Sequence, residues 1–413
     1  MPRREETVPH GGGYAVPILA LTLGHVFSNA VRTIPALAAD VLQRDLGLTA
    51  EGLGLLTGVF PLVFALGMVP VGVGLDRFGV RRTSLCVLLV AICGAVLAAL
   101  APGVPAMLVA QALLGFGCSG MLMCPMTYAV RAVPPARFVI WSGVILTLGN
   151  SGLLLSASPL AWLVEWQGWR AGFWASAGLA VLVFLAVTLT VRQPPPKRGA
   201  PASLWEDARA VLTMAASRPL RPMMVIAFAS FAVMFGVRGL WGGPWLMEVK
   251  GLSRIEAGNI LLGFAVAMTV APLTCSWIGR ALGRPALLLA GSHYAAAFIV
   301  LAVIGGGPGG VLSAAAGLPM LPVTWDTVLF ILLGFIISFQ ALTFDMVRRV
   351  VPPEATGRAL SAQNISFFGG AAVLQVVSGL AAAWGGPAAA LACFAVALLL
   401  CTSGFLLLRR RAC

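Results

Sequence analysis

The sequence predicts an all-α integral membrane protein with twelve transmembrane helices in two pseudo-symmetric six-helix bundles, and with both termini in the cytoplasm. Three observations lead to this prediction. Of the 413 residues, 59% are hydrophobic and only 10% are charged, which leaves too little polar surface for a soluble domain. The apolar residues form runs of roughly 20, the length that crosses a bilayer as a helix. Almost all basic residues lie between these runs.

Twelve apolar runs are bounded by charged residues or by proline and glycine. Each is apolar on all sides and longer than the alternating segments of a transmembrane β-barrel, so we interpret them as helices. The expected spans are 14–40, 52–75, 83–101, 105–131, 138–164, 170–191, 222–247, 255–279, 285–305, 325–348, 358–384 and 387–408. The segment 305–325 is rich in glycine and proline and is expected to be a loop or a ragged helix end.

The positions of lysine and arginine predict the orientation. With the N-terminus inside, 21 of the 27 basic residues fall in inner segments and four (Arg44, Arg170, Lys250 and Arg254) fall in outer ones. This asymmetry follows the positive-inside rule and places both termini in the cytoplasm. Topology therefore accounts for the net charge of +13, and no nucleic-acid partner is expected.

The chain divides into two similar halves. The polar segment 192–221 separates six spans from six, and an even number per half gives both halves the same orientation. Thr49 and Ser253 are predicted N-caps at matching places, and Ser253 with Glu256 fits a capping box. The expected organisation is a tail 1–13, a bundle 14–191, a central cytoplasmic loop 192–221, a bundle 222–408 and a basic tail 409–413.

Two arginines, Arg32 and Arg238, are the basic residues that lie inside spans. They occupy matching places in the first and seventh spans. A guanidinium cannot shed its charge, and an arginine at the centre of a membrane helix costs about 2.5–3.5 kcal/mol on insertion scales. Facing a shared central cavity, two such charges favour an anion, which guanidinium forks bind bidentately. The alternative is that each arginine bonds backbone carbonyls or helix C-termini in a structural role.

The segment 72–82 reads GVGLDRFGVRR and is identified as the G-x-x-x-D-R-x-G-x-R-R signature loop of the major facilitator superfamily. The resemblance implies two six-helix bundles around a substrate path that opens alternately to each side, without a cofactor. It also implies a cytoplasmic gate, which we assign to Gly72, Asp76, Arg77, Gly79, Arg81 and Arg82. The second-half counterpart at 275–284 keeps Arg280, Gly283 and Arg284 but lacks the aspartate, which argues against a second gate of this kind.

The positions of Arg32 and Arg238 resemble those of the arginine pair in organophosphate/phosphate antiporters and related organic-anion symporters. Segments 31–58 and 237–251 are similar to the corresponding regions of that sub-family. The resemblance implies a small organic or phosphorylated anion as the substrate, with a co-transported proton or an exchanged anion. Arg32 and Arg238 are the residues to which this role is carried over.

Five other polar or aromatic residues are candidates for the substrate site. His25 and Asn29 share a helix face with Arg32, and His25 could carry a coupling proton or only bond a neighbour. Asn150 and Gln375 lie inside the fifth and eleventh spans, where polar side chains either join helices or line a site. Trp241 follows Arg238 by three residues and either forms a wall of the site or packs against neighbouring helices.

Asp345 and Arg349 are expected to form an i,i+4 ion pair near the inner side.

Other functions are less well supported by the residues. A methionine-rich segment at 120–126 contains soft ligands that suit copper, but methionine also fills gaps in cores, and no metal site is expected. The arginine and glycine–proline patterns of proton-coupled drug exporters are missing at 111–115 and 156–159. A drug or neutral-metabolite transporter with structural arginines remains the alternative. No nucleophile–base set predicts an enzyme, and no appended domain predicts a sensor. The expected surroundings are the lipid bilayer, the inner membrane in a bacterium.

Overall fold

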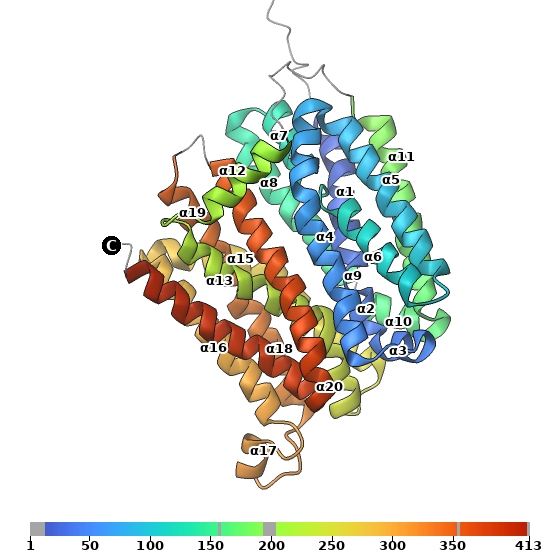
Figure 1. Cartoon of the computed structure of the whole chain (residues 1–413), viewed down its shortest axis with the longest axis vertical. Coiled ribbons are helices and arrows are strands. Elements are labelled where there is room, and N and C mark those ends of the chain that lie inside the picture. The colour runs from blue at the N-terminus through green and yellow to red at the C-terminus, as the bar shows by residue number, and fades with distance from the viewer. Residues whose placement is uncertain (1–12, 156–157, 193–203, 353–355, 411–413) are drawn as a thin grey trace, which may run out of the picture.

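A computed structural model describes residues 13–155, 158–192, 204–352 and 356–410 (Figure 1). Every regular element in these ranges is a helix, which confirms the predicted fold class. The tails 1–13 and 409–413 lie mostly outside the described residues, as does the first part of the central loop. The predicted domain boundaries therefore stay predictions.

The helices before the central loop gather on one side of the molecule (Figure 1). They are α1 (Ala15–Val31), α2 (Ile34–Leu37), α3 (Ala39–Leu46), α4 (Ala50–Arg77), α5 (Gly79–Leu100), α6 (Val104–Cys118), α7 (Met123–Ala132), α8 (Pro135–Asn150), α9 (Gly152–Leu155), α10 (Ser158–Gln167) and α11 (Trp169–Thr190). We call these the first half of the chain.

The remaining helices form the other side. They are α12 (Leu204–Ala215), α13 (Arg221–Val233), α14 (Gly242–Pro244), α15 (Arg254–Leu282), α16 (Pro285–Gly305), α17 (Val311–Ala315), α18 (Val323–Ile337), α19 (Leu342–Val350) and α20 (Thr356–Arg410), with the π-helical segments η1 (Met234–Trp241) and η2 (Trp245–Val249) and the 3-10 segment η3 (Ser338–Ala341). Of these, α12 lies inside the predicted central loop, and α13–α20 make up the second half.

Ten of the described helical stretches are long and apolar enough to cross a membrane, and Ala15–Val31 is a shorter apolar helix. The stretch Ala359–Arg410 is interrupted by non-helical backbone at Gly385 and Gly386. Both predicted N-caps are present, and the capping box of Ser253 and Glu256 is complete. The number of twelve crossings and the cytoplasmic location of the termini stay predictions.

Several predicted spans are broken, which the apolar pattern did not reveal. The first span, expected at 14–40, ends at Val31 and continues as α2 and α3, because Pro35 has no N–H to donate to the Val31 carbonyl. The fourth span is likewise divided near Pro125, and the fifth is interrupted at Ser151, between α8 and α9. The seventh span runs through two π-helical segments between Met234 and Val249.

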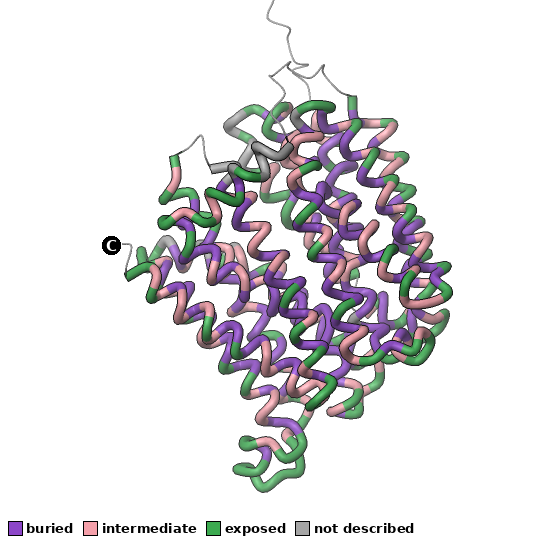
Figure 2. The backbone as a smooth tube through the Cα atoms, in the orientation of Figure 1, coloured by how far each residue is buried: buried purple, intermediate pink, exposed green. Residues whose placement is uncertain are grey.

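The two halves meet along α4 and α20, which pack along each other. A Cβ on Gly54 would lie 2.7 Å from the Cα of Gly379, so the two helix backbones touch there. We call the end of the molecule that holds α3, α17 and the start of α4 the outer end, since the basic residues predict that it faces outward. Buried residues run through the middle of both halves (Figure 2).

Candidate functional site

Arg32 lies at the carboxyl end of α1. It is the C-cap residue of that helix, where the partial negative charge of the helix end favours a cation. Its half-buried guanidinium lies over two rings of the second half, 4.8 Å from the centre of Phe235 and 5.9 Å from that of Phe231. Within the described ranges this guanidinium has no hydrogen bond or ion pair. The rings attract its charge but do not neutralise it.

Arg238 lies in the π-helical segment η1, a geometry that often marks functional sites. Its side chain is 3% exposed. The Nη2 atom donates a hydrogen bond of 2.5 Å to the backbone carbonyl of Leu153, which belongs to α9 in the broken fifth span. The contact therefore joins the two halves of the chain, and it is the kind of bond that a structural arginine makes.

The two arginines lie near each other between the halves. Phe235, which faces the Arg32 guanidinium, precedes Arg238 by three residues on η1, so both positive charges lie in the same part of the interface. Like charges repel more strongly in a low-dielectric surrounding than in water. An anion placed between them would replace this repulsion with attraction.

Three of the predicted site residues meet between α1 and α8. The Nδ2 atom of Asn29 donates to the Gly149 carbonyl at 2.9 Å and lies 3.5 Å from Oδ1 of Asn150 and 3.4 Å from Nε2 of His25. Gly149 fits closely against the imidazole, since a Cβ there would lie 1.9 Å from Cδ2 of His25. We call His25, Asn29 and Asn150 the amide–imidazole cluster.

Trp241 and Gln375 are connected through Ser378. The indole Nε1 of Trp241 donates to Oγ of Ser378 at 2.8 Å, and Ser378 donates to the Gln375 carbonyl at 2.9 Å. These bonds join η1 to α20 within the second half. The side-chain Oε1 of Gln375 is buried and has no hydrogen-bond partner among the described residues, so it could accept a bond from a ligand or a water.

An aromatic wall, which sequence reasoning missed, faces Arg32. Phe231 and Phe235 lie 5.1 Å apart, and both contact Phe368 of α20, at 4.9 and 5.8 Å between ring centres. Phe64 of α4 stacks on Phe368 at 3.9 Å, so the wall includes a ring from the first half. The spacing could have revealed it, because Phe231, Phe235 and Arg238 fall on one helix face.

The signature loop lies at the end opposite the outer end, away from this site. Gly79 adopts φ +79°, and Gly283 in the second-half counterpart adopts φ +62°, a backbone conformation that favours glycine. Arg81 donates to the Thr188 carbonyl at 3.1 Å, at the end of α11. The side chain of Asp76 lies outside the described residues, so the gate assignment stays a prediction.

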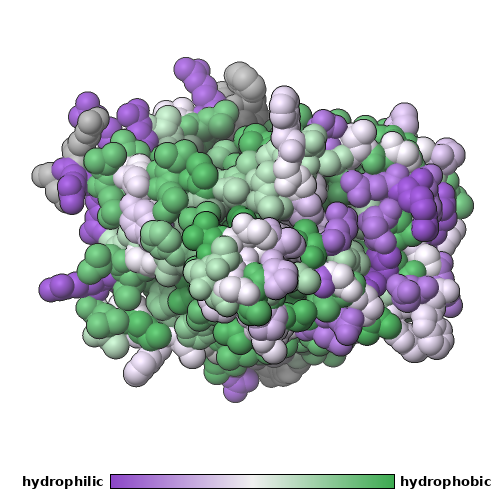
Figure 3. All heavy atoms as spheres, turned by 90° about the horizontal axis from the view of Figure 1, so that it is seen from below, coloured by the Kyte–Doolittle hydropathy of each residue, from purple (hydrophilic) through white to green (hydrophobic). Residues whose placement is uncertain are grey.

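At the outer end, Arg254 connects the two halves. It donates to both carboxylate oxygens of Asp40, at 2.9 and 2.7 Å, and to Glu165 at 3.0 Å. It also donates to the Leu37 carbonyl. Burial alone would raise the pKa of the Asp40 carboxyl, but the hydrogen bonds and charge of Arg254 lower it below its ordinary value. We call Arg254, Asp40, Glu165 and Leu37 the outer latch. Figure 3 views the molecule from the outer end, where hydrophilic side chains gather on one side of the surface.

A second ion pair at the outer end is fully buried, and the sequence pattern did not predict it. Nζ of Lys250 lies 2.9 Å from Oδ2 of Asp326, and the side chains are 1% and 0% exposed. Lys250 donates to the carbonyls of Gly306 and Leu321, and Trp245 donates to Asp326. The pair therefore ties the ends of the seventh, ninth and tenth spans together.

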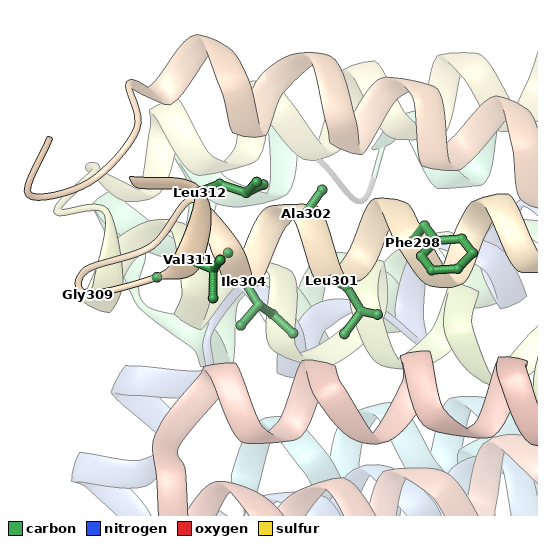
Figure 4. Close-up of a pocket in the computed structure, with 9 residues that line it drawn as sticks. Phe298, Leu301, Ala302, Ile304, Gly309, Val311 and Leu312 are labelled. Carbon is green, nitrogen blue, oxygen red and sulfur yellow. The ribbon is translucent and has the colours of Figure 1, made fainter. Parts of the chain in front are cut away.

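An apolar groove of about 530 Å³ lies on the outside of the second half, between the end of α16 and α17 (Figure 4). Its lining includes Phe298, Leu301, Ile304 and Val311 and contains no charged residue. None of the predicted site residues lines it. Its composition suits hydrocarbon, so we do not place the substrate site there.

The sequence matches known transporters. The model of the Major Facilitator Superfamily matches residues 20–344. The chain belongs to this superfamily and is a transporter rather than an enzyme. It is an integral, multi-pass membrane protein.

Three relatives illustrate the range of the superfamily. The tetracenomycin C resistance and export protein of Streptomyces glaucescens is 29% identical over 64% of this chain and 58% of its own length, so the chain spans less than two thirds of that exporter. The probable nitrate/nitrite transporter NarK2 of Mycobacterium tuberculosis is 26% identical over 76% of this chain and 75% of its own. The niacin transporter NiaP of Acinetobacter baylyi is 22% identical over 69% of this chain and 71% of its own length.

Solved structures share the fold over nearly the whole chain. A bacterial homologue of the human lysosomal transporter Spinster, in an inward-facing and unoccupied conformation, superposes with a TM-score of 0.77 at 16% identity and covers 97% of both chains. A POT family transporter in complex with a thioalcohol-conjugated peptide gives a TM-score of 0.78 at 12% identity, over 97% of this chain and 96% of its own. At these identities the likeness establishes the architecture alone.

Proposed function

We propose that this transporter moves a small organic or phosphorylated anion by alternating access, with Arg32 and Arg238 as the anion clamp. The observation that carries the proposal is the placement of both guanidiniums between the halves, where Arg32 has no acidic partner in the described ranges. Charge-assisted bonds from such forks to a carboxylate or phosphate are about twice as strong as neutral ones. The amide–imidazole cluster adds polar groups from α1 and α8.

The relatives support an anionic or organic substrate. Two of them are named as transporters of nitrate/nitrite and of niacin. His25 is our candidate for a coupling proton, because it contacts Asn29 one turn before Arg32. An exchanged anion would make such a proton unnecessary.

The outer latch supports alternating access. Arg254 holds Asp40, Glu165 and the Leu37 carbonyl of the opposite half, and Ser158 donates to Asn259 at 2.6 Å nearby. In this conformation the halves are closed at the outer end, so substrate would enter or leave from the other side. Opening outward requires these contacts to break.

A second candidate is a drug or neutral-metabolite transporter. The bond from Arg238 to the Leu153 carbonyl favours it, because a structural arginine needs no anion. One relative is a resistance and export protein. Two central cations would nevertheless repel the cationic compounds that many exporters carry.

Thermal unfolding of the purified protein against a ligand panel tests the proposal. The panel contains phosphate, glycerol phosphate, mono- and dicarboxylates and nitrate, with cationic drugs as controls. A ligand at 100 times its dissociation constant stabilises the protein by about 2.7 kcal/mol. We expect one anion class to stabilise the wild type and Arg44→Gln, which removes an exposed outer charge, but not Arg238→Gln. Equal stabilisation of Arg238→Gln would favour the second candidate.

A further inference from the structure

The surroundings of Arg32 are polar on one side and aromatic on the other. Along α1 it follows Asn29, which belongs to the amide–imidazole cluster. Across the interface its guanidinium faces the rings of Phe231 and Phe235. Any anion held by Arg32 therefore has polar groups in one direction and carbon surfaces in the other.

The aromatic wall is continuous and buried. Phe235, Phe368 and Phe64 are 5%, 7% and 8% exposed, and their ring centres lie 3.9–5.8 Å apart. Rings at such distances stack in offset or edge-to-face arrangements. A flat apolar body beside Arg32 could join this stack, since ring faces attract both a cation and another ring.

We propose that the preferred substrate is an aromatic monocarboxylate, with its carboxylate on the arginines and its ring against the wall of Phe231, Phe235, Phe368 and Phe64. This inference rests on the proposed anion clamp and names the substrate class for it. A carboxylate carries its oxygens at one end, which matches the division between donors and rings around Arg32.

Anions with oxygens on every side fit this arrangement less well. Nitrate has three oxygens in a plane, and phosphate has four around a centre. Next to the wall, at least one oxygen would face carbon, and a buried acceptor without a donor weakens binding. A carboxylate has two acceptor oxygens, so it can be bound by Arg32 and share Arg238 with the Leu153 carbonyl that Arg238 already bonds.

The test compares affinities in the purified full-length protein by isothermal titration. The probes are benzoate, cyclohexanecarboxylate (the same charge without a flat ring), benzamide (the ring without the charge), nitrate and phosphate. We expect benzoate to bind about two- to twelve-fold more tightly than cyclohexanecarboxylate, the range that corresponds to 0.5–1.5 kcal/mol for an aromatic pair. Benzamide, nitrate and phosphate should bind more weakly than benzoate.

Variants separate the ring from the charge. Phe235→Leu should remove the preference for benzoate over cyclohexanecarboxylate, whereas Phe298→Leu, on the 62% exposed position of α16, should keep it. Arg238→Gln should weaken both carboxylates. The wild-type preference itself needs no variant, so a misfolded Phe235→Leu protein would not remove the test.

Two different results would overturn the inference. If nitrate or phosphate binds more tightly than benzoate and loses affinity in Arg238→Gln, the aromatic assignment is wrong and the anion clamp stands. The same holds if benzoate and cyclohexanecarboxylate bind equally. If no anion depends on Arg238, both the assignment and the clamp are wrong.

Discussion

At the scale of single residues, both arginines lie where their helices depart from regular α-helical geometry. Arg32 caps α1 just before Pro35, which cannot donate to the Val31 carbonyl. Arg238 lies among the glycines of a π-helical segment. Such irregular turns free backbone carbonyls inside the membrane, and charged side chains can use them. The bond from Arg238 to Leu153 is one example.

Lysine at position 32 should not replace arginine. Arg32→Lys keeps the charge but loses the planar fork that binds a carboxylate or phosphate at two points. Losing one charge-assisted bond of about 1.5–3 kcal/mol weakens anion binding roughly ten-fold or more. Titration with the best ligand of the panel measures this, and Arg44→Lys at the exposed outer position is the matched control. Equal affinity of Arg32→Lys and wild type would contradict bidentate binding.

A methyl group on Gly149 should displace His25. The added Cβ would lie 1.9 Å from the imidazole, whereas Gly143 on the same helix has open space at its Cβ position. We expect Gly149→Ala to weaken ligand binding and lower the melting temperature. Gly143→Ala should leave binding unchanged, because the added methyl group meets open space. It should not lower the melting temperature, because alanine is favoured over glycine in helices by about 0.5–1 kcal/mol. If both variants behave alike, His25 is not part of the site.

The candidate residues of the site could be singled out from the sequence, and their geometry could not. A charge inside an apolar run is conspicuous, and residues three, four or seven positions away share its helix face. This reasoning singled out His25 and Asn29 with Arg32. The partner surfaces across the helix interfaces, such as the Leu153 carbonyl and the ring of Phe368, depend on tertiary packing that no local pattern encodes.

At the scale of elements, the buried pair of Lys250 and Asp326 should hold the outer end of the second half. Removing one partner of a buried ion pair costs about 3–5 kcal/mol, because the other charge stays uncompensated. We expect Asp326→Asn to destabilise the protein by about that amount. The exposed i,i+4 pair of Asp345 and Arg349, which the sequence predicted correctly, gives the control. Arg349→Gln should change stability by less than about 1 kcal/mol.

The double variant of this pair distinguishes charge from packing. Lys250→Met with Asp326→Asn removes both charges but leaves an acceptor for the Trp245 indole, which now bonds Asp326. Thermal unfolding should show that it recovers most of the stability lost by Asp326→Asn. If the double variant is less stable than either single one, the hydrogen bonds of Lys250 to the Gly306 and Leu321 carbonyls matter more here than charge compensation.

The outer latch should depend on pH only in acid. The pKa of Asp40 is lowered from its ordinary 3.8 by Arg254 against the effect of burial. A carboxyl with a lowered pKa stabilises the folded state fully above its ordinary pKa, and this contribution is lost as the pH falls through the lowered value. We expect Asp40→Asn to lower the melting temperature equally at pH 6 and 8, and the difference to shrink below pH 4. A difference that changes between pH 6 and 8 would contradict the assignment.

The pattern of apolar residues predicted where the chain crosses the membrane but not where individual helices begin and end. Length and composition located the membrane-crossing stretches well, because both follow from the thickness of the bilayer. The breaks near Pro35 and Pro125 were missed, since a membrane helix can also continue past a proline. The helix Leu204–Ala215 inside the expected central loop was also missed. The average polarity of the segment 192–221 predicted a loop and concealed this short helix.

At the scale of the whole molecule, the contact of α4 with α20 should set how closely the halves approach at the outer end. Gly54 and Gly379 touch backbone to backbone there. We expect Gly54→Val to hinder closure and to slow exchange in proteoliposomes while ligand binding is retained. Gly369 on α20 has open space at its Cβ position, so Gly369→Val is the control. Full exchange by Gly54→Val would show that closure of this interface is not needed.

Exchange of the stabilising anion across proteoliposome membranes tests the central claim most directly. Vesicles loaded with that anion take up its labelled form through the wild type, Arg44→Gln, Arg32→Gln, Arg238→Gln and the double variant. The proposed clamp predicts rapid exchange by the wild type and Arg44→Gln, and loss of exchange in each clamp variant despite normal insertion. Exchange at the wild-type rate by the double variant would contradict the anion clamp.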